Sequence, residues 1–383
     1  MGQILLLSES IGAGHERAAQ AVEEALRTLD PQRGVTRVNL LDTFRPRTAK
    51  ALRTLYLQTL ARGPKLWGKW YEWQREKEWN RVGRLIVREA LCKEVGPWIR
   101  RLAPDAIICT HPLPACLIAE LKRQGMQVPL ITVLTDYDPH GYWLHPAVDL
   151  YCVPLPEIQE RMNARLLGRS QVRATGIPVS QRFLEALTAV ERGSERNRQV
   201  LLMGGGLGLG VLRMVEELVD GGLTDDLTVV CGFNQTLRRE LKGRFGGLPN
   251  VKIRGYSQQV QSLMARSDLL VTKPGGMTVA EALVMRLPMV LCSAIPGQEH
   301  RNGELMSAYG VARRASSAEE GADLVRHLLT AESDRAQMIE RIEEIRQPYA
   351  AFEVAEAALQ LARRTERSTG LLQTNETGSW RYA

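Results

Sequence analysis

The chain has 383 residues, enough for two domains that each bury an apolar core. Apolar residues make up 44% and charged residues 24%, a globular composition that excludes a largely disordered chain. The longest apolar runs are only strand-length, so the sequence predicts neither a membrane-spanning helix nor a secretory signal peptide, and we expect a cytoplasmic protein. Six cysteines are scattered without a C-x-x-C pair, which favours buried, reduced thiols.

The net charge of +7 is concentrated in one segment. Between Arg45 and Arg101 the chain carries 15 Lys or Arg against 5 Asp or Glu, and it holds five of the seven tryptophans, among them Trp67, Trp70 and Trp73. Basic side chains interleaved with tryptophan favour an anionic membrane surface, because cations are attracted to headgroups and indole rings settle at the interface. A solvated charged face with tryptophans packed into the core is the alternative. No nucleic-acid partner is predicted, since no nucleic-acid module accompanies the charge.

Short apolar runs alternate with helical patterns along the chain. They predict strands at 4–7, 35–40, 106–110, 130–134 and 150–154, and again at 200–203, 227–231, 251–255, 269–272 and 289–293. Continuous apolar strands separated by helices indicate parallel sheets with both faces covered. We therefore predict an α/β protein with two doubly wound domains, residues 1–182 and 199–345, joined by a polar linker at 183–198.

The end of the chain has two predicted parts. An amphipathic helix rich in Glu and Arg is predicted over about 334–364. Residues 365–383 are polar and lack an apolar pattern, so we expect a disordered tail there.

One strand-turn-helix corner carries the clearest chemical signal. In the run LLVTKPGGMTVAEA an apolar strand meets a glycine turn that opens a helix. Such a turn presents unpaired backbone N–H groups and the positive end of a helix dipole to an anion, and Gly275 and Gly276 allow close approach. Thr278 is expected to cap the helix, Lys273 precedes the turn, and Glu281 lies one turn on, where its carboxylate can accept hydrogen bonds from ribose. The corner predicts a nucleotide diphosphate site, with a plain structural corner as the alternative.

A second polar segment supports a ligand site. The run PGQEHRN begins at Pro296, after a further apolar strand, at the sheet edge where ligands bind in open α/β folds. A structural turn needs the Pro and the Gly, but it has no use for five consecutive polar side chains. We therefore expect Gln298 and Glu299 to contact the ligand.

The first half of the sequence offers a candidate for proton transfer. His15 follows the first strand and the glycines of the run GAG, where Gly14 lets a second substrate approach and the next helix offers its N-terminus. We predict that His15 is a general base, with a purely structural helix cap as the alternative. Asp136 and Asp138 follow the strand at 130–134. Asp136 could orient His15 or act as the base itself, and both roles stay open.

These blocks occur together in one known family. KPGGMTVAEA followed by PGQEHRN resembles the donor-binding half of UDP-sugar glycosyltransferases with the two-domain GT-B fold. The chain most resembles the monogalactosyldiacylglycerol synthase and processive diacylglycerol glucosyltransferase family, glycosyltransferase family 28 in the broad sense. Further blocks that carry the resemblance are ILLLSESIGAGHERAAQAVEEAL, TVLTDYDPHGYWLHPAVDLYCVP, GIPVSQRF and MGGGLGLG. It covers about residues 4–350 and implies two Rossmann-like domains that face a cleft.

The resemblance implies roles for individual residues. For the donor it implies Gly205, Gly206, Gly276, Met277 and Thr278 at the phosphates, Arg254 and Tyr256 at uracil, Glu281 at ribose, and Gln298 and Glu299 at the sugar. Lys273 or Arg254, with the helix N-terminus, would meet the leaving-group charge, so neither a metal nor another cofactor is expected. His111 and His140 would line the acceptor side. A terminal helix at 346–364 would cross back to the first domain.

The implied reaction is inverting transfer of a hexose from a UDP-sugar to the hydroxyl of diacylglycerol, by an enzyme bound peripherally to the inner face of the cell membrane. His300 and Arg301 depart from the family pattern, which leaves glucose, galactose and N-acetylglucosamine open. Alternatives are N-acetylglucosamine transfer to a lipid-linked peptidoglycan precursor and a UDP-N-acetylglucosamine 2-epimerase of the same fold. A nicotinamide dehydrogenase would leave PGQEHRN unexplained.

Overall fold

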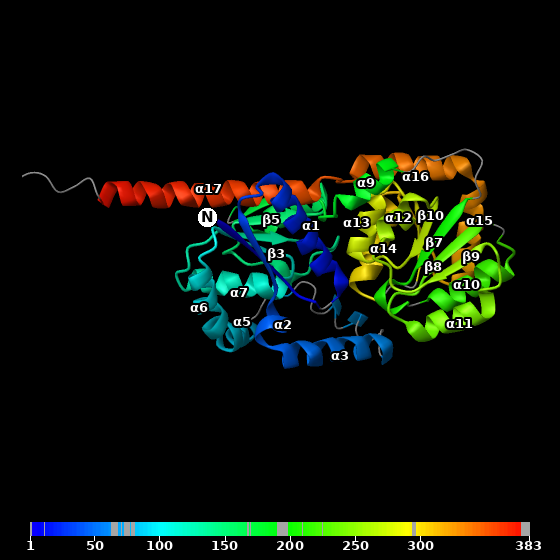
Figure 1. Ribbon diagram of the computed structural model, residues 1–383, viewed down its shortest axis with the longest axis horizontal. Helices are drawn as coiled ribbons and strands as arrows, with labels where there is room; N and C mark the ends of the chain where they lie inside the picture. The colour runs from blue at the N-terminus through cyan, green and yellow to red at the C-terminus, as the bar shows by residue number, and fades with distance from the viewer. Residues whose placement is uncertain are drawn as a thin grey trace, which may run out of the picture.

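The computed structural model shows two α/β halves side by side (Figure 1). It describes residues 2–10, 12–62, 68–69, 71–72, 77, 81–166, 168, 170–189, 198–208, 210–223, 225–292 and 296–376. In the described part of the chain the first half contains strands β1–β6 and the second half contains β7–β12, and each set forms one parallel sheet. The predicted fold of two parallel-sheet α/β domains is therefore confirmed.

The first sheet has the strand order β2-β1-β3-β4-β5-β6. Its strands are β1 (Gln3–Ser8), β2 (Gly34–Asn39), β3 (Ala106–Cys109), β4 (Leu130–Val133), β5 (Leu150–Val153) and β6 (Gln171–Ala174). In the register of the central strands, Ile4 pairs with Val35 on one side and with Ala106 on the other. The apolar residues of β1 and β3 are buried, as expected for central strands of a sheet covered on both faces.

The first half also contains helices and single helical turns. They are α1 (Ala13–Leu29), α2 (Leu40–Phe44), α3 (Pro46–Arg62), α5 (Arg81–Val87), a π-helical turn at Arg88–Cys92, α6 (Lys93–Leu102), α7 (Pro112–Arg123), a 3₁₀ turn at Gly141–Trp143 and α8 (Pro156–Leu166). Helix α1 shows the pattern that produces them, because Ala18, Val22 and Leu26 recur at helical spacing and all face the core.

The second sheet has the order β12-β11-β10-β7-β8-β9. Its strands are β7 (Gln199–Met203), β8 (Asp226–Val230), β9 (Val251–Arg254), β10 (Leu269–Thr272), β11 (Met289–Leu291) and β12 (Ala312–Arg314). Its helices are α9 (Arg182–Ala189), a 3₁₀ turn at Gly205–Leu207, α10 (Val211–Asp220), α11 (Gln235–Phe245), α12 (Val260–Ala265), α13 (Gly276–Val284), α14 (Gln298–Ala308), α15 (Ala318–Thr330) and α16 (Glu332–Ile345).

The strand order fixes where a ligand can bind. After β1 the chain moves outward to β2 and returns to β3 on the other side of β1, and the second sheet reverses in the same way between β7 and β10. Ligands of open α/β sheets bind in the crevice at the carboxyl ends of strands where the order reverses. The loop before His15 lies at the first such crevice. The glycine loop at 204–208 and the glycine turn at 273–276 lie at the second.

The last helix returns to the first half. Helix α17 (Ala350–Glu376) packs against α1 and β3, and Figure 1 shows it running along the first half after α16 of the second. Small residues, among them Ala351, Ala355 and Ala358, join the core on one face of the first sheet. Their size lets the helix approach the sheet closely.

Two segments differ from their predictions. The tail predicted to be disordered from residue 365 instead continues α17 to Glu376, because the segment has no proline and contains good helix formers; residues 377–383 lie outside the described residues. The linker predicted at 183–198 begins with α9, which packs on α12 of the second half. All ten predicted strands are present, whereas β6 and β12 were not predicted.

Two other expectations concern thiols and membranes. All six cysteines are buried free thiols, as predicted. Of the helices in the described ranges, none combines the length and the apolarity needed to cross a bilayer.

The return of α17 can be tested at Gly176, which follows β6. Gly176 has a φ of +88°, and a Cβ there would collide with the side chain of Gln347 just before α17. We expect Gly176→Ala to destabilise the protein by about 2–4 kcal/mol, because backbone strain adds to the clash. Gly125→Ala is the matched control: φ is +100° but the surrounding space is open, so only strain of about 1–2 kcal/mol is expected. If chemical denaturation shows that Gly176→Ala and Gly125→Ala lose the same free energy of unfolding, close packing at Gly176 is contradicted.

Candidate active site

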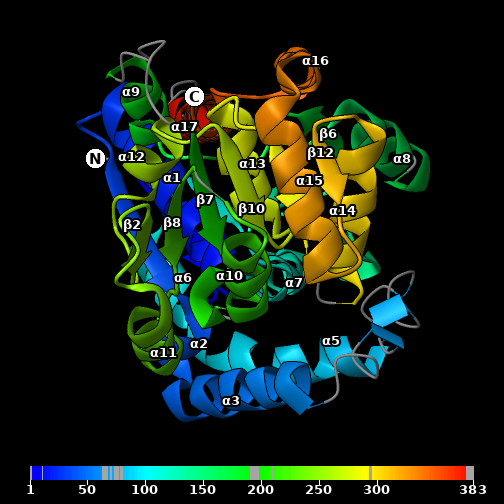
Figure 2. The same ribbon diagram turned by 90° about the vertical axis from the view of Figure 1, so that its right-hand side faces the viewer.

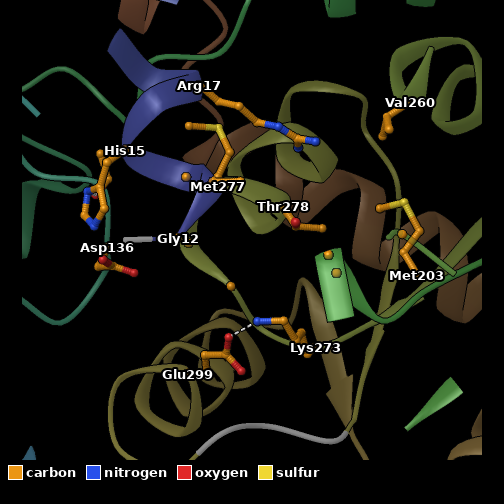
Figure 3. A pocket seen from close by; sticks show the side chains of 18 of the residues that line it. Gly12, His15, Arg17, Asp136, Met203, Val260, Lys273, Met277, Thr278 and Glu299 are labelled. Atoms are coloured by element: carbon orange, nitrogen blue, oxygen red, sulfur yellow. Dashed lines mark hydrogen bonds and ion pairs between the residues drawn. The ribbon is translucent and has the colours of Figure 1, made fainter. Parts of the chain in front are cut away.

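One pocket of about 290 Å³ lies between the two halves, where both crevices open (Figure 3). The predicted residues that line it are Gly14, His15, Asp136, Gly205, Gly206, Tyr256, Lys273, Gly275, Gly276, Met277, Thr278, Gln298 and Glu299. Residues predicted for two separate tasks, proton transfer and anion binding, therefore share one cavity.

His15 stands in the first turn of α1. Its Nδ1 lies 2.7 Å from the carbonyl oxygen of Thr110, which can only accept a hydrogen bond. Nδ1 therefore carries the proton, and Nε2 is the nitrogen that can accept one. The hydroxyl oxygen of Thr135 lies 2.8 Å from the same Nδ1 and helps to fix the ring. Burial lowers the pKa of His15 to about 4, so the ring is neutral near pH 7 and competent as a base.

Two further histidines lie near His15 and do not line the pocket. His111 packs edge-on against His15 with ring centroids 4.6 Å apart, and its Nδ1 accepts the backbone N–H of Leu113 at 3.1 Å, which caps α7. His140 lies among aromatic rings that include Trp143. Burial lowers the pKa of both histidines. The acceptor-side role implied for His111 and His140 stays a prediction, and the contact of His111 with His15 is that of a supporting residue.

Asp136 follows β4 and faces the second half. Its carboxylate interacts with the side chains of Gln298 and Asn302 through hydrogen bonds. Burial nevertheless raises the pKa of Asp136 to about 7. The hydrogen bonds that orient His15 come from Thr110 and Thr135, so the orienting role considered for Asp136 is filled by other groups. Asp136 remains the competing candidate for the base.

The glycine turn opens α13 and packs against the first half. The helix begins at Gly276 with Gly275 as its N-cap, and no side chain caps it, so the prediction that Thr278 is the cap is wrong. Its first N–H groups therefore lack a capping side chain, which suits an anion. A Cβ at Gly276 would collide with the carbonyl oxygen of Thr135 and with the Asp136 carboxylate. Only glycine lets the halves approach this closely.

Lys273 brings a cation to the pocket, where it forms an ion pair with Glu299 (Figure 3). Gly205, in the glycine loop after β7, has a φ of +67°, and a Cβ there would lie 2.8 Å from Cε of Lys273. The glycine loop and the glycine turn therefore lie side by side at the second crevice. Their backbone groups can serve one anion together.

The aromatic wall of the pocket contains one residue that sequence reasoning missed. Tyr256, after β9, stacks on Phe233, after β8, with ring centroids 4.3 Å apart and an interplanar angle of 13°. Both rings line the pocket and are largely exposed, so a base can stack on them. The run GFN directly after the strand at 227–231 was the available signal for Phe233. Arg254 is exposed and does not line the pocket, which leaves its predicted uracil contact without support.

Glu281 lies on α13 one turn beyond Thr278, but it does not line the pocket. Its Oε1 accepts a hydrogen bond from Nη1 of Arg17 at 3.1 Å. Burial raises the pKa of Glu281 to about 7, an effect that Arg17 opposes. Arg17, which sequence reasoning missed, belongs to α1 and does line the pocket (Figure 3). The ribose contact of Glu281 stays a prediction, with Arg17 beside it on the pocket side.

The PGQEHRN run also joins the two halves, which sequence reasoning did not anticipate. Asn302 is fully buried; it accepts the backbone N–H of Tyr137 at 3.3 Å and donates to the carbonyl oxygen of Pro274 at 3.1 Å. Arg301 forms an ion pair with Glu72 of the first half at 2.6 Å. Gln298 and Glu299, early in the run, line the pocket. Arg301 and Asn302, at its end, connect the two halves that form the pocket.

Some predictions fall outside this description. Trp67, Trp70 and Trp73 lie outside the described residues. Within the described ranges, no three His, Cys, Asp or Glu side chains group as a metal-binding cluster, and the expectation that no metal is needed stays a prediction.

The models of two known families match the two halves of the chain. The family model of monogalactosyldiacylglycerol (MGDG) synthase matches residues 15–179, a range that contains His15 and Asp136. The model of the glycosyltransferase family 28 C-terminal domain matches residues 200–361, which contain the glycine loop and the glycine turn.

Individual relatives match over nearly their whole length. The processive diacylglycerol beta-glucosyltransferase of Bacillus subtilis is 29% identical over 90% of this chain and 91% of its own. The Staphylococcus carnosus protein of the same name is 27% identical over 94% and 93%. The crystal structure of Acinetobacter baumannii MurG matches 94% of this chain and 100% of its own, with a TM-score of 0.61 and 13% identity, which shows a shared fold. The chain therefore belongs to the monogalactosyldiacylglycerol synthase and processive diacylglycerol glucosyltransferase family, and it is a glycosyltransferase of the GT-B fold.

Proposed function

We propose that this enzyme transfers a hexose from a UDP-sugar to the hydroxyl of diacylglycerol, with inversion and without a metal ion, at the inner face of the cell membrane. The names of the curated relatives support the lipid acceptor and favour glucose as the hexose. The observation that carries the proposal is that a single pocket joins a neutral His15 to an uncapped helix N-terminus. A base and an anion site thus face one cavity.

In the proposed reaction His15 takes the proton of the acceptor. Because Thr110 holds Nδ1, Nε2 receives the hydroxyl proton as the acceptor oxygen attacks the anomeric carbon. The bond from that carbon to UDP breaks while the new glycosidic bond forms on the opposite face of the sugar. One displacement of this kind inverts the configuration.

The second half would stabilise UDP as it leaves. The first N–H groups of α13, the glycine loop after β7 and the cation of Lys273 all border the pocket. Groups fixed in place before the reaction stabilise a developing anion without reorganising, and in this proposal they do so without a metal ion. The stacked rings of Phe233 and Tyr256 would hold uracil, and Gln298 with Glu299 would meet the sugar.

Helix α3 is the proposed membrane face. It carries Arg47, Lys50 and Arg53 and has no acidic residue in its sequence. Leu52 and Leu55, three residues apart, are 40% and 61% exposed. Figure 2 shows α3 and α5 along the lower edge of the molecule, opposite α17. Exposed leucines beside cations suit insertion into an anionic bilayer.

A donor panel tests the proposed reaction. Incubation with UDP-glucose, UDP-galactose or UDP-N-acetylglucosamine and vesicles containing diacylglycerol should yield a glycolipid, identified by mass, with or without a chelator. A parallel set of reactions contains a lipid-linked peptidoglycan precursor in place of diacylglycerol, and product from that precursor alone would assign the alternative acceptor. Epimerised donor without transfer would assign the epimerase.

The base can be identified from its pH dependence. His15→Ala should lower kcat by ~10²–10⁴ while UDP affinity changes little. Because the pKa of His15 is lowered to about 4, kcat of the unaltered enzyme should stay level between about pH 6 and pH 8, where this base is deprotonated. If kcat instead falls as the pH is lowered through about 7, and Asp136→Asn rather than His15→Ala causes the large loss of kcat, the base is Asp136, whose pKa is raised to about 7.

If α3 is the membrane face, loss of its exposed leucines should weaken binding to vesicles. The double variant Leu52→Gln, Leu55→Gln should weaken binding to anionic vesicles by about tenfold or more, because two exposed apolar side chains are lost from the contact. Leu248→Gln, at a 37% exposed leucine of the second half, is the matched control and should bind normally. Sedimentation with vesicles measures both, and unchanged binding of the double variant would remove α3 from the membrane face.

A further inference from the structure

A cation of the first half forms part of the wall of the nucleotide pocket. Arg17 lies two residues after His15 on α1 and lines the pocket. Its Nη1 donates to Oε1 of Glu281 at 3.1 Å, so it pairs with a carboxylate of the opposite half. The Arg17 side chain is 35% exposed and that of Glu281 only 3%. Figure 3 shows Arg17 extending from α1 over the pocket.

This pairing leaves Glu281 half satisfied. Its Oε2 is buried and has no hydrogen-bond partner within the described residues. A buried carboxylate oxygen without a partner is unfavourable, and a hydroxyl donor from a ligand would relieve it. Thr278, one turn earlier on the same face of α13, lines the pocket. The carboxylate therefore lies just behind the pocket wall, and the guanidinium of Arg17 covers it.

The arginine and the lysine that line this pocket are already paired with carboxylates of the protein. Arg17 pairs with Glu281, and Lys273 pairs with Glu299. A nucleotide diphosphate is strongly anionic and requires a cation that can leave its carboxylate. Arginine suits this task, because its planar fork of N–H donors binds phosphate oxygens in pairs. The ribose of the same nucleotide carries hydroxyls that can replace the guanidinium at Glu281.

We propose that Arg17 exchanges partners: it pairs with Glu281 until the donor binds, and then it binds the donor diphosphate while the ribose hydroxyls hydrogen-bond to Glu281. This inference rests on the proposed UDP-sugar donor and on Glu281 as its ribose contact. Arg17 and His15 belong to the same helix. The exchange therefore makes α1 of the first half part of the donor site of the second.

Calorimetry with UDP and with uridine separates an exchange from a static role. In Arg17→Ala, UDP affinity should fall by about tenfold or more, because the diphosphate loses a charged partner. Uridine has no phosphate. In the unaltered protein its ribose must therefore displace Arg17 from Glu281, and Arg17 gains no phosphate partner in return. Its affinity should therefore rise about threefold or more in Arg17→Ala.

Three further variants complete the design. In the double variant Arg17→Ala, Glu281→Gln the gain for uridine should disappear, because the gain depends on the freed carboxylate. Arg17→Lys keeps the charge without the planar fork, and its UDP affinity should lie between those of Arg17→Ala and the unaltered protein. Arg27→Ala, farther along α1 where Arg27 pairs with Glu23, should leave both affinities unchanged.

The outcomes separate the inference from the function beneath it. Unchanged UDP affinity in Arg17→Ala, or a parallel loss of UDP and uridine affinity, would overturn the exchange and leave the proposed function in place. Failure of the unaltered protein to bind UDP would overturn the proposed donor itself.

Discussion

The close contact between the N-terminus of α13 and the loop after β4 sets the geometry of the whole site. Because Gly276 has no side chain, the carbonyl oxygen of Thr135 and the carboxylate of Asp136 lie directly against the start of the helix. Thr135 also fixes the ring of His15 through its hydroxyl. One contact thus determines how far the candidate base stands from the candidate anion site, although the two belong to different sheets.

Ionisable groups around this contact are buried. Burial lowers the pKa of His15 and raises those of Asp136 and Glu281. Several displaced pKa values in one cleft are typical of catalytic sites, because proton transfer and charge stabilisation both gain from low water content. The chemistry of the pocket is therefore a property of the closed pair of halves.

Features that depend on a short run of residues can be predicted from the sequence. Ten strands appear as apolar runs, whereas β6 and β12, with the sequences QVRA and ARR, are polar edge strands without such a run. His15 and the glycine turn stand out because each directly follows an apolar strand. Arg17 and Glu281 are 264 residues apart, and Asn302 and Tyr137 are 165 apart. No spacing within a motif encodes such pairs; they depend on how the halves pack.

Helix α17 is the last helix in the sequence, yet it packs into the core of the first half. Its residues Val354, Ala355 and Ala358 complete the core on one face of the first sheet, beside Ile4 and Leu6. During synthesis on the ribosome this face cannot be fully covered until the last helix has emerged. A polypeptide divided between residues 189 and 198 would leave one fragment with bare apolar surface and the other with an unpartnered helix. Each half on its own would lack a packing partner that the intact chain supplies.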